Sequence, residues 1–243
     1  MSVAAEPRRR DRTAIEDYLK TIWGLTEWEH GQVVSNAAVA ERLRVSTSSV
    51  SEMVRKLSRQ GLVRHEPWGG IELTDEGRRE ATSVVRRHRL LETFLSRQLG
   101  YAWDEVHDEA EVLEHAASEL MIARIDRLLG HPYRDPHGDP IPTPEGTVHR
   151  PEARPLAALE PGERGFVARI LDDSPELLRW LGENQLGLDA AVVVREQEPF
   201  GGPLVVEAGG EAGRSGVGLV DGEMVDDVHL RMAAATLHRA GVE

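Results

Sequence analysis

The 243-residue chain contains no cysteine, and aromatic residues make up only 5% of it. Without thiols, the chain cannot form disulfides, bind zinc through thiolates or use a cysteine nucleophile. Any metal ion that it binds must therefore be held by nitrogen and oxygen ligands. The sequence also lacks an apolar run of the ~18 residues that a membrane-spanning helix needs. Its first residues, MSVAAEPRRRDR, have no apolar stretch after their charges, so we expect a cytoplasmic protein without a signal peptide or a membrane partner.

The net charge of −13 is unevenly distributed along the chain. The first 75 residues carry 11 basic and 11 acidic side chains, so all of the excess acidity follows Asp75. A neutral N-terminal module can approach DNA phosphates if its arginines share one face. The overall acidity therefore does not exclude a nucleic-acid partner.

Imidazole and carboxylate side chains recur at helical spacing in the middle of the chain. Four such side chains are spaced at i, i+4, i+7 and i+8, which places them on one face of a helix. A helix face with this spacing normally carries apolar residues that pack in a core. The members of this group are His107, Glu111, Glu114 and His115. An earlier pair, His88 and Glu92, repeats the i, i+4 spacing. That pair alone is more typical of a solvated helix, but both clusters together favour a divalent-metal site.

The first 75 residues have the element order of a winged helix-turn-helix. Residues 13–29 predict an amphipathic helix. Ser35-Asn36 can cap a short second helix. Ser46 can cap a third helix, TSSVSEMVRKLSRQ, and Gly61 is placed to end it. Two short strands, LVRHE and IELT, flank the turn PWGG and predict the wing. The predicted core residues are Val39, Leu43, Val50, Val54 and Leu57.

Short polar and basic side chains follow one another on the second helix of this pair and in the wing. Serines at the start of the helix can reach phosphates and base edges in a major groove, although serines are also common as plain helix caps. The basic residues can contact phosphates. The candidate DNA-binding residues are Ser46, Thr47, Ser48, Ser49, Ser51, Glu52, Arg55, Lys56, Arg59 and Arg64.

The remainder of the chain predicts helices, then a tether, then a small β domain. Residues 75–99 and 105–129 each predict one long amphipathic helix. Their apolar stripe, a core or a dimer face, consists of Leu90, Leu91, Phe94, Leu95, Val112, Leu113, Leu120, Ile125 and Leu128. Residues 130–161 are rich in proline and glycine and predict a linker or an ordered tether. From about residue 162, short β-type runs around one helix, PELLRWL, predict a small β-barrel or sandwich.

With these elements, the chain resembles the diphtheria toxin repressor (DtxR/MntR) family of metal-dependent transcriptional repressors. The resemblance rests on the wing, on RRHRLLETFL, on VHDEAEVLEH, which is the most specific segment, and on DPHGDPIP. It implies a mainly α fold with a small β domain. The implied domains are a winged helix-turn-helix over 1–75, a helical metal-binding and dimerisation domain over 76–145, a linker over 146–160 and an SH3-like (FeoA-like) β-barrel over 161–243. It also implies a homodimer that binds operator DNA and represses metal-uptake genes.

Carried over residue by residue, the resemblance implies two metal sites. The residues that resemble the ancillary site are His88, Glu92 and His107. The residues that resemble the primary, regulatory site are Asp17, Glu111, Glu114 and His115. Asp172 and Asp173 are further ancillary candidates by position only, and the alternative for them is a turn before PELLRWL.

The resemblance also bears on which metal is bound. The iron-responsive branch has methionine where this chain has Asp17 and cysteine where it has Glu111. Hard carboxylates suit Mn²⁺, so we expect a Mn²⁺-dependent regulator, with Fe²⁺ as the alternative. Small members of the manganese branch carry a glutamate where this chain has Lys20. That difference favours two separate sites over a dinuclear one.

Two other functions fit parts of the pattern. A carboxylate-bridged dimetal enzyme favours a Glu-x-x-His repeat on two helices, and this chain has Glu111-x-x-Glu114-His115 without a matched second copy. A winged-helix regulator that senses something other than metal would leave the acidic helix merely solvated. We expect a regulator and not an enzyme.

Overall fold

A computed structural model describes residues 5–28, 33–65, 70–171, 174–197, 204–208, 216–219 and 233–236. The chain divides into two compact units, each with its own apolar core. The first unit is drawn from residues 1–88, 112–122 and 141–148, and the second from 89–111, 123–140 and 149–243. No helix of the described residues combines the length and the apolarity needed to cross a membrane.

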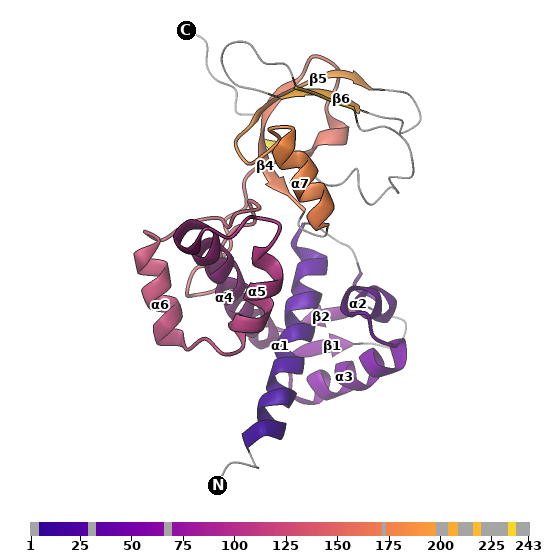
Figure 1. The fold of residues 1–243 in the computed structure, drawn as a ribbon. Helices are drawn as coiled ribbons and strands as arrows, with labels where there is room; N and C mark the ends of the chain where they lie inside the picture. Colours follow the sequence, from indigo (N-terminus) through magenta and orange to yellow (C-terminus); the bar gives the residue numbers. More distant parts are fainter. Residues whose placement is uncertain are drawn as a thin grey trace. The chain divides into compact units, whose positions relative to one another are not determined.

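The first unit contains the predicted winged helix-turn-helix (Figure 1). Its elements are α1 (Ala5–Glu27), α2 (Asn36–Leu43), α3 (Thr47–Arg59), β1 (Val63–His65) and β2 (Ile71–Leu73). Helix α1 packs against α2 and β2, and α3 packs against α2 and β1. The predicted core is confirmed, because Val39, Val50, Val54 and Leu57 are buried, while Leu43 is partly buried against them.

Local sequence signals set the ends of these helices. The Ser35 hydroxyl accepts a hydrogen bond from the Ala38 amide at 3.1 Å, and the Ser46 hydroxyl accepts one from the Ser49 amide at 3.2 Å. Gly61 follows α3 with a φ of +75°, a conformation that glycine adopts without a steric penalty. The turn predicted at residues 67–70 lies mostly outside the described residues.

Helix α4 (Asp75–Leu99) matches the prediction for this segment, but the single helix predicted over residues 105–129 is wrong. Two helices, α5 (Val106–Glu114) and α6 (Glu119–Leu128), replace it. The Ser118 hydroxyl accepts a hydrogen bond from the Met121 amide at 3.2 Å and so begins a new helix. The break places His115 just beyond the end of α5, where its ring is no longer fixed by helical geometry.

The predicted apolar stripe divides into a buried and an exposed part. Leu90, Leu91, Leu95 and Ile125 are buried. In contrast, Val112, Leu120 and Leu128 are exposed by 72%, 63% and 61%. An apolar surface of this kind is typical of a face that meets a partner.

The segment predicted as a linker or tether begins with an ordered turn. The Asp135 carboxylate accepts hydrogen bonds from the amides of His137 and Asp139, both at 2.9 Å. All three of these residues are buried. Proline and glycine exclude regular structure here without excluding burial.

The second unit ends in a small antiparallel sheet, as predicted for the C-terminal region (Figure 1). Its strand order is β3-β8-β4-β5-β6-β7. In chain order the elements are β3 (Arg154–Pro155), η1 (Leu156–Ala158), β4 (Arg164–Ile170), α7 (Pro175–Glu183), β5 (Ala191–Gln197), β6 (Leu204–Ala208), β7 (Gly216–Leu219) and β8 (Ala233–Thr236). Ser174 caps α7, and Leu178 of that helix packs with Val167, Val192 and Val206 in the core.

Two glycines of the first unit should respond oppositely to the same substitution. At Gly77, in the first turn of α4, a Cβ atom would lie 1.9 Å from the Leu62 carbonyl oxygen. Since backbone must move, we expect Gly77→Ala to lower the free energy of unfolding by on the order of 1–3 kcal/mol. At Gly24, inside α1, nothing lies within 4 Å, so Gly24→Ala should raise stability by about 1 kcal/mol through helix propensity. Denaturant unfolding measures both changes, and a shared sign would contradict this packing.

Candidate metal centre

Two carboxylates and one imidazole converge within the first unit from separate helices. Asp17 lies on α1, while Glu114 and His115 lie at the end of α5. Each offers a ligand atom, and these atoms lie within 4.8 Å of one another. His115 Nε2 is 2.8 Å from Asp17 Oδ1 and 3.4 Å from Glu114 Oε1. Glu111 lies one turn earlier on α5, so helix geometry gives it the predicted face.

The Glu114 carboxylate is completely buried, and other residues of the chain supply its counter-charge. Lys20 Nζ donates to Oε1 at 2.9 Å and to Oε2 at 3.0 Å. His88 Nδ1 lies 2.6 Å from Oε2. A buried carboxylate without a cation would cost several kcal/mol. Lys20 is therefore more than a departure from a family pattern, because its ammonium group engages both oxygens of a predicted metal ligand.

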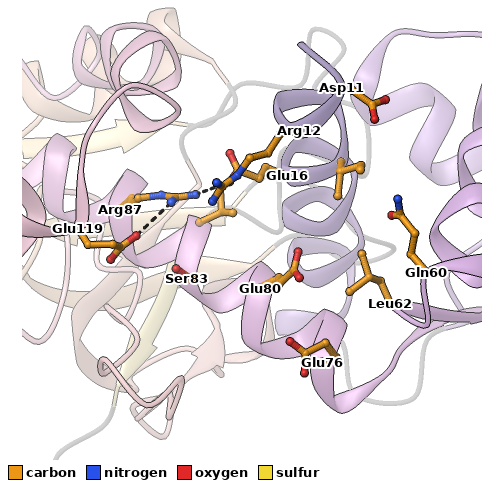
Figure 2. Close-up of a pocket in the computed structure, with 12 residues that line it drawn as sticks. Asp11, Arg12, Glu16, Gln60, Leu62, Glu76, Glu80, Ser83, Arg87 and Glu119 are labelled. Carbon is orange, nitrogen blue, oxygen red and sulfur yellow. Dashed lines mark hydrogen bonds and ion pairs between the residues drawn. The ribbon is translucent and has the colours of Figure 1, made fainter. Parts of the chain in front are cut away.

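A third carboxylate, that of Glu16, lies against His115 and was missed from the sequence. Glu16 Oε2 is 2.8 Å from His115 Nδ1. Its other oxygen accepts hydrogen bonds from Arg12 and Arg87, both at 3.0 Å. Figure 2 shows Arg87 reaching from α4 to both Glu16 and Glu119. Consecutive residues of a helix point about 100° apart. The prediction of Asp17 as a ligand therefore gave no reason to expect that Glu16 would also contact His115.

Glu16 and Arg87 also line an open cavity of about 550 Å³ (Figure 2). Most other charged groups in its wall are carboxylates, among them Glu76 and Glu80. Burial, followed by the charge of Glu76, raises the pKa of Glu80. Although the cavity is open, the Glu16–Arg87 pair itself is buried, with side-chain exposures of 8% and 7%.

The carboxylates around His115 favour its protonated ring. Hydrogen bonds to Asp17 and then to Glu16 raise the pKa of His115 from 6.5 to about 9. Burial raises the pKa of Glu16, but its hydrogen bond to His115 and the charge of Arg87 outweigh burial and lower it to about 2. The stability that protonated His115 contributes is fully present below pH 6.5 and is lost as the pH rises through about 9. A metal ion and a proton therefore compete for His115 below that pH.

Two of the three predicted ancillary ligands lie together in the second unit. His107 Nδ1 is 3.4 Å from Glu92 Oε1, and Glu92 is buried. His107 Nε2 is 3.7 Å from Glu111 Oε1. His88 stands one turn before Glu92 on α4. The remaining candidates, Asp172 and Asp173, lie outside the described residues.

The primary group suits a divalent cation. Carboxylate oxygens and an imidazole nitrogen are its preferred protein ligands when thiolates are absent. Glu16, Asp17 and Glu114 bring three carboxylates around one imidazole, and the most deeply buried of them already requires a positive charge. Asp17, Glu111, Glu114 and His115 are therefore the residues that would hold such an ion.

Most candidate DNA-binding residues lie on the exposed surface of α3 and of the hairpin. The exposed members are Ser46, Thr47, Ser48, Ser49, Glu52, Arg55, Arg59 and Arg64. Ser51 is used within the fold, because it donates to the Thr47 carbonyl at 2.9 Å and accepts from Asn36 at 3.0 Å. Lys56 forms an ion pair with Asp11 of α1.

Comparison with known proteins identifies the arrangement. Models of the iron-dependent repressor N-terminal DNA-binding domain and of the iron-dependent repressor metal-binding and dimerisation domain match residues 12–71 and 74–143. The chain belongs to the iron- and manganese-dependent repressor family. Its members are transcriptional repressors, which confirms the prediction of a regulator and not an enzyme. A FeoA domain model matches residues 154–214, in agreement with the predicted C-terminal domain.

The most informative relatives include proteins named for each metal. The iron-dependent repressor IdeR of Mycobacterium leprae is 34% identical over 209 residues, which cover 81% of this chain and 89% of that protein. The diphtheria toxin repressor of Corynebacterium diphtheriae is 39% identical over 127 residues, about half of either chain (52% and 55%). A solved manganese-dependent transcriptional repressor in complex with manganese is 46% identical, with a TM-score of 0.83 and coverage of 92% of this chain and 100% of that one. These relatives show that the chain belongs to a family of metal-dependent transcriptional repressors.

Replacing Lys20 should have opposite effects on stability and on metal affinity. In Lys20→Met, Glu114 loses its ammonium partner, so the free energy of unfolding in chelator should fall by on the order of 3 kcal/mol. Mn²⁺ should bind more tightly, because no ammonium group competes for the two oxygens. Lys20→Arg keeps the positive charge and is the matched control. Thermal unfolding and Mn²⁺ titration measure the two effects, and unchanged stability of Lys20→Met would show that Glu114 is neutralised elsewhere.

Proposed function

We propose that this protein is a Mn²⁺-dependent repressor that binds operator DNA as a homodimer in the cytoplasm and represses metal-uptake genes. The observation that carries the proposal is the meeting of Asp17, on α1, with Glu114 and His115, at the end of α5. Helix α1 also packs against the DNA-reading module. Asp17, Glu114 and His115 therefore belong to the same packed unit as α3.

Helix α1 is the element through which the centre acts on DNA binding. Glu16, Asp17 and Glu114 gather three negative charges around one ring, and in the metal-free chain Lys20, Arg87 and the protonated ring of His115 offset them. When bound, a divalent cation supplies the positive charge that these carboxylates need. Asp17 and Glu114 then hold α1 against the end of α5, which favours one orientation of the reading head among several.

The surface of α3 supports operator recognition. Its first two turns present Ser48, Ser49 and Glu52, whose short or acidic side chains can hydrogen-bond to base edges. Arg55, Arg59 and Arg64 are exposed cations that suit phosphates.

The homodimer rests on a different part of the chain. The match over residues 74–143 is to a metal-binding and dimerisation domain. The exposed side chains of Val112 and Leu120 give this region an apolar surface that a second copy could cover. A two-fold dimer places two α3 helices on two half-sites of a pseudo-palindrome.

The preference for Mn²⁺ rests on Asp17 and Glu111. Both offer hard oxygen ligands, and the relative solved with manganese covers 92% of this chain. The second candidate is Fe²⁺, since the relative from Mycobacterium leprae is named an iron-dependent repressor.

Metal-dependent DNA binding tests the proposal directly. Fluorescence anisotropy with a palindromic promoter fragment should show affinity rising about 5–150-fold when Mn²⁺ replaces chelator, the range of ordinary allosteric coupling. Asp17→Asn should abolish most of this gain, whereas Glu119→Gln, an exposed change near the same network, should preserve it. Equal affinity with Mn²⁺ and with chelator would remove the metal from the mechanism.

Metal choice is tested by exchanging oxygen for sulfur ligands. The double change Asp17→Met and Glu111→Cys should shift the ratio of Mn²⁺ to Fe²⁺ activation midpoints towards Fe²⁺, because sulfur favours the softer ion. Both midpoints should also weaken, since two carboxylate charges are lost. The measurement is anaerobic DNA-binding titration with each metal. An unchanged ratio would mean that these two positions do not set selectivity.

A further inference from the structure

Helix α3 presents an apolar and a polar stripe on opposite sides. The apolar stripe is buried in the core and consists of Val50, Val54 and Leu57. The polar stripe is exposed, recurs at i, i+4, i+7 and i+11, and consists of Ser48, Glu52, Arg55 and Arg59. At about 100° per residue, the polar stripe is about 60° wide and lies opposite the apolar one. Glu52 is the one acidic member of the stripe that faces away from the core.

The hydroxyl groups near Glu52 have hydrogen-bond partners within the fold. Ser46 Oγ lies 2.8 Å from both Ser48 Oγ and Ser49 Oγ. Ser51 donates to a backbone carbonyl of the preceding turn. Any bond from these hydroxyls to a base therefore competes with bonds that the start of the helix already makes.

The carboxylate of Glu52, in contrast, has no hydrogen bond or ion pair among the residues that the structure describes. The usual partner of a glutamate in a helix is a cation four residues later. Lys56 has that position, but it forms an ion pair with Asp11 of α1. The contact between α1 and α3 thus leaves the hydrogen-bonding capacity of Glu52 unused.

The chemistry of a carboxylate restricts which base it can contact. An ionised carboxylate only accepts hydrogen bonds, so it suits only a base edge that donates. In the major groove the donors are the N4 amino group of cytosine and the N6 amino group of adenine, whereas guanine and thymine present acceptors there. Adenine also presents its N7 acceptor beside N6, and that lone pair repels the second carboxylate oxygen. Cytosine has no acceptor beside N4, so it is the base that suits Glu52.

The charge of Glu52 also acts against other sequences. Arg55 and Arg59 of the same stripe attract phosphates whatever the sequence is. Glu52 is repelled by the phosphates and gains a hydrogen bond only where a base amino group meets it. The stripe therefore combines attraction to any DNA with a penalty at every site that lacks the right base, and such a penalty is a source of specificity.

We propose that Glu52 selects cytosine at one position in each half-site of the operator. This inference rests on the proposed function, because it requires α3 in the major groove of operator DNA. The two-fold dimer places the two selected cytosines on opposite strands, at positions related by the dyad. Glu52 then determines which sequence is bound, while the arginines of the stripe determine how tightly any DNA is bound.

The test measures base preference with the full chain. Sites are selected in Mn²⁺ from double-stranded oligonucleotides of random sequence, and single base-pair changes in the selected site are then compared by fluorescence anisotropy. The wild type should prefer C·G to A·T at one position of each half-site by roughly 5- to 150-fold. Glu52→Gln should prefer A·T at the same position, because a glutamine amide can pair with both N6 and N7 of adenine.

Glu41→Gln is the matched control. Glu41 is an exposed glutamate of α2, in the same winged helix-turn-helix but outside the stripe of α3. Both variants remove one negative charge, so both should bind DNA more tightly in general through weaker repulsion by the phosphates. The base preference of Glu41→Gln should equal that of the wild type.

A cytosine preference that is absent from the wild type, or that persists in Glu52→Gln, would overturn the proposal. The same change of preference in Glu41→Gln would also overturn it, because net charge and not position would then set the base. The preference is a ratio of affinities and is measured in Mn²⁺ and in chelator. Binding that ignores the metal but keeps the preference contradicts only the metal activation under the proposed function. Metal-dependent binding without the preference contradicts only the role of Glu52, and absence of DNA binding in both conditions would overturn both.

Discussion

A buried carboxylate must be paired with a positive charge, and the first unit is arranged around that requirement at Glu114. Lys20 of α1 and His88 of α4 both reach this one side chain of α5. Three helices therefore depend on how a single negative charge is neutralised. A change of cation at this point alters the contacts of all three helices at once, whereas exposed ion pairs such as Arg79–Glu76 affect only their own turn.

Features governed by neighbouring residues could be predicted from the sequence. Ser35, Ser46 and Gly61 set helix ends through hydrogen bonds or φ angles within a few residues, so the winged helix-turn-helix followed from pattern alone. The break between α5 and α6 was missed because apolar residues keep helical spacing across it. The structure shows instead that the Ser118 hydroxyl accepts a hydrogen bond from the Met121 amide and caps the start of α6, so the chain begins a new helix there and does not continue α5.

Features that depend on how distant elements meet could not be predicted in the same way. The spacing from His107 to His115 predicted which residues share one face of α5, but it did not show which residues of α1 lie opposite that face. Glu16 was therefore missed, although it directly precedes Asp17. Lys20 was noticed as a difference from a family pattern, and only the structure shows its bonds to Glu114. Asp135 and His137 escaped notice because prolines and glycines indicate irregular backbone and say nothing about burial.

Helix α1 carries both Asp11, which pairs with Lys56 of α3, and Asp17, which lies at the metal centre. The two positions are six residues apart, about 9 Å along a continuous helix. Under the proposed function, coupling between them is reciprocal: whatever factor metal adds to DNA affinity, DNA adds to metal affinity. Repressor bound to an operator therefore retains its ion at concentrations that strip the free protein. As metal becomes scarce, the unbound pool empties first and the occupied promoters are the last to respond.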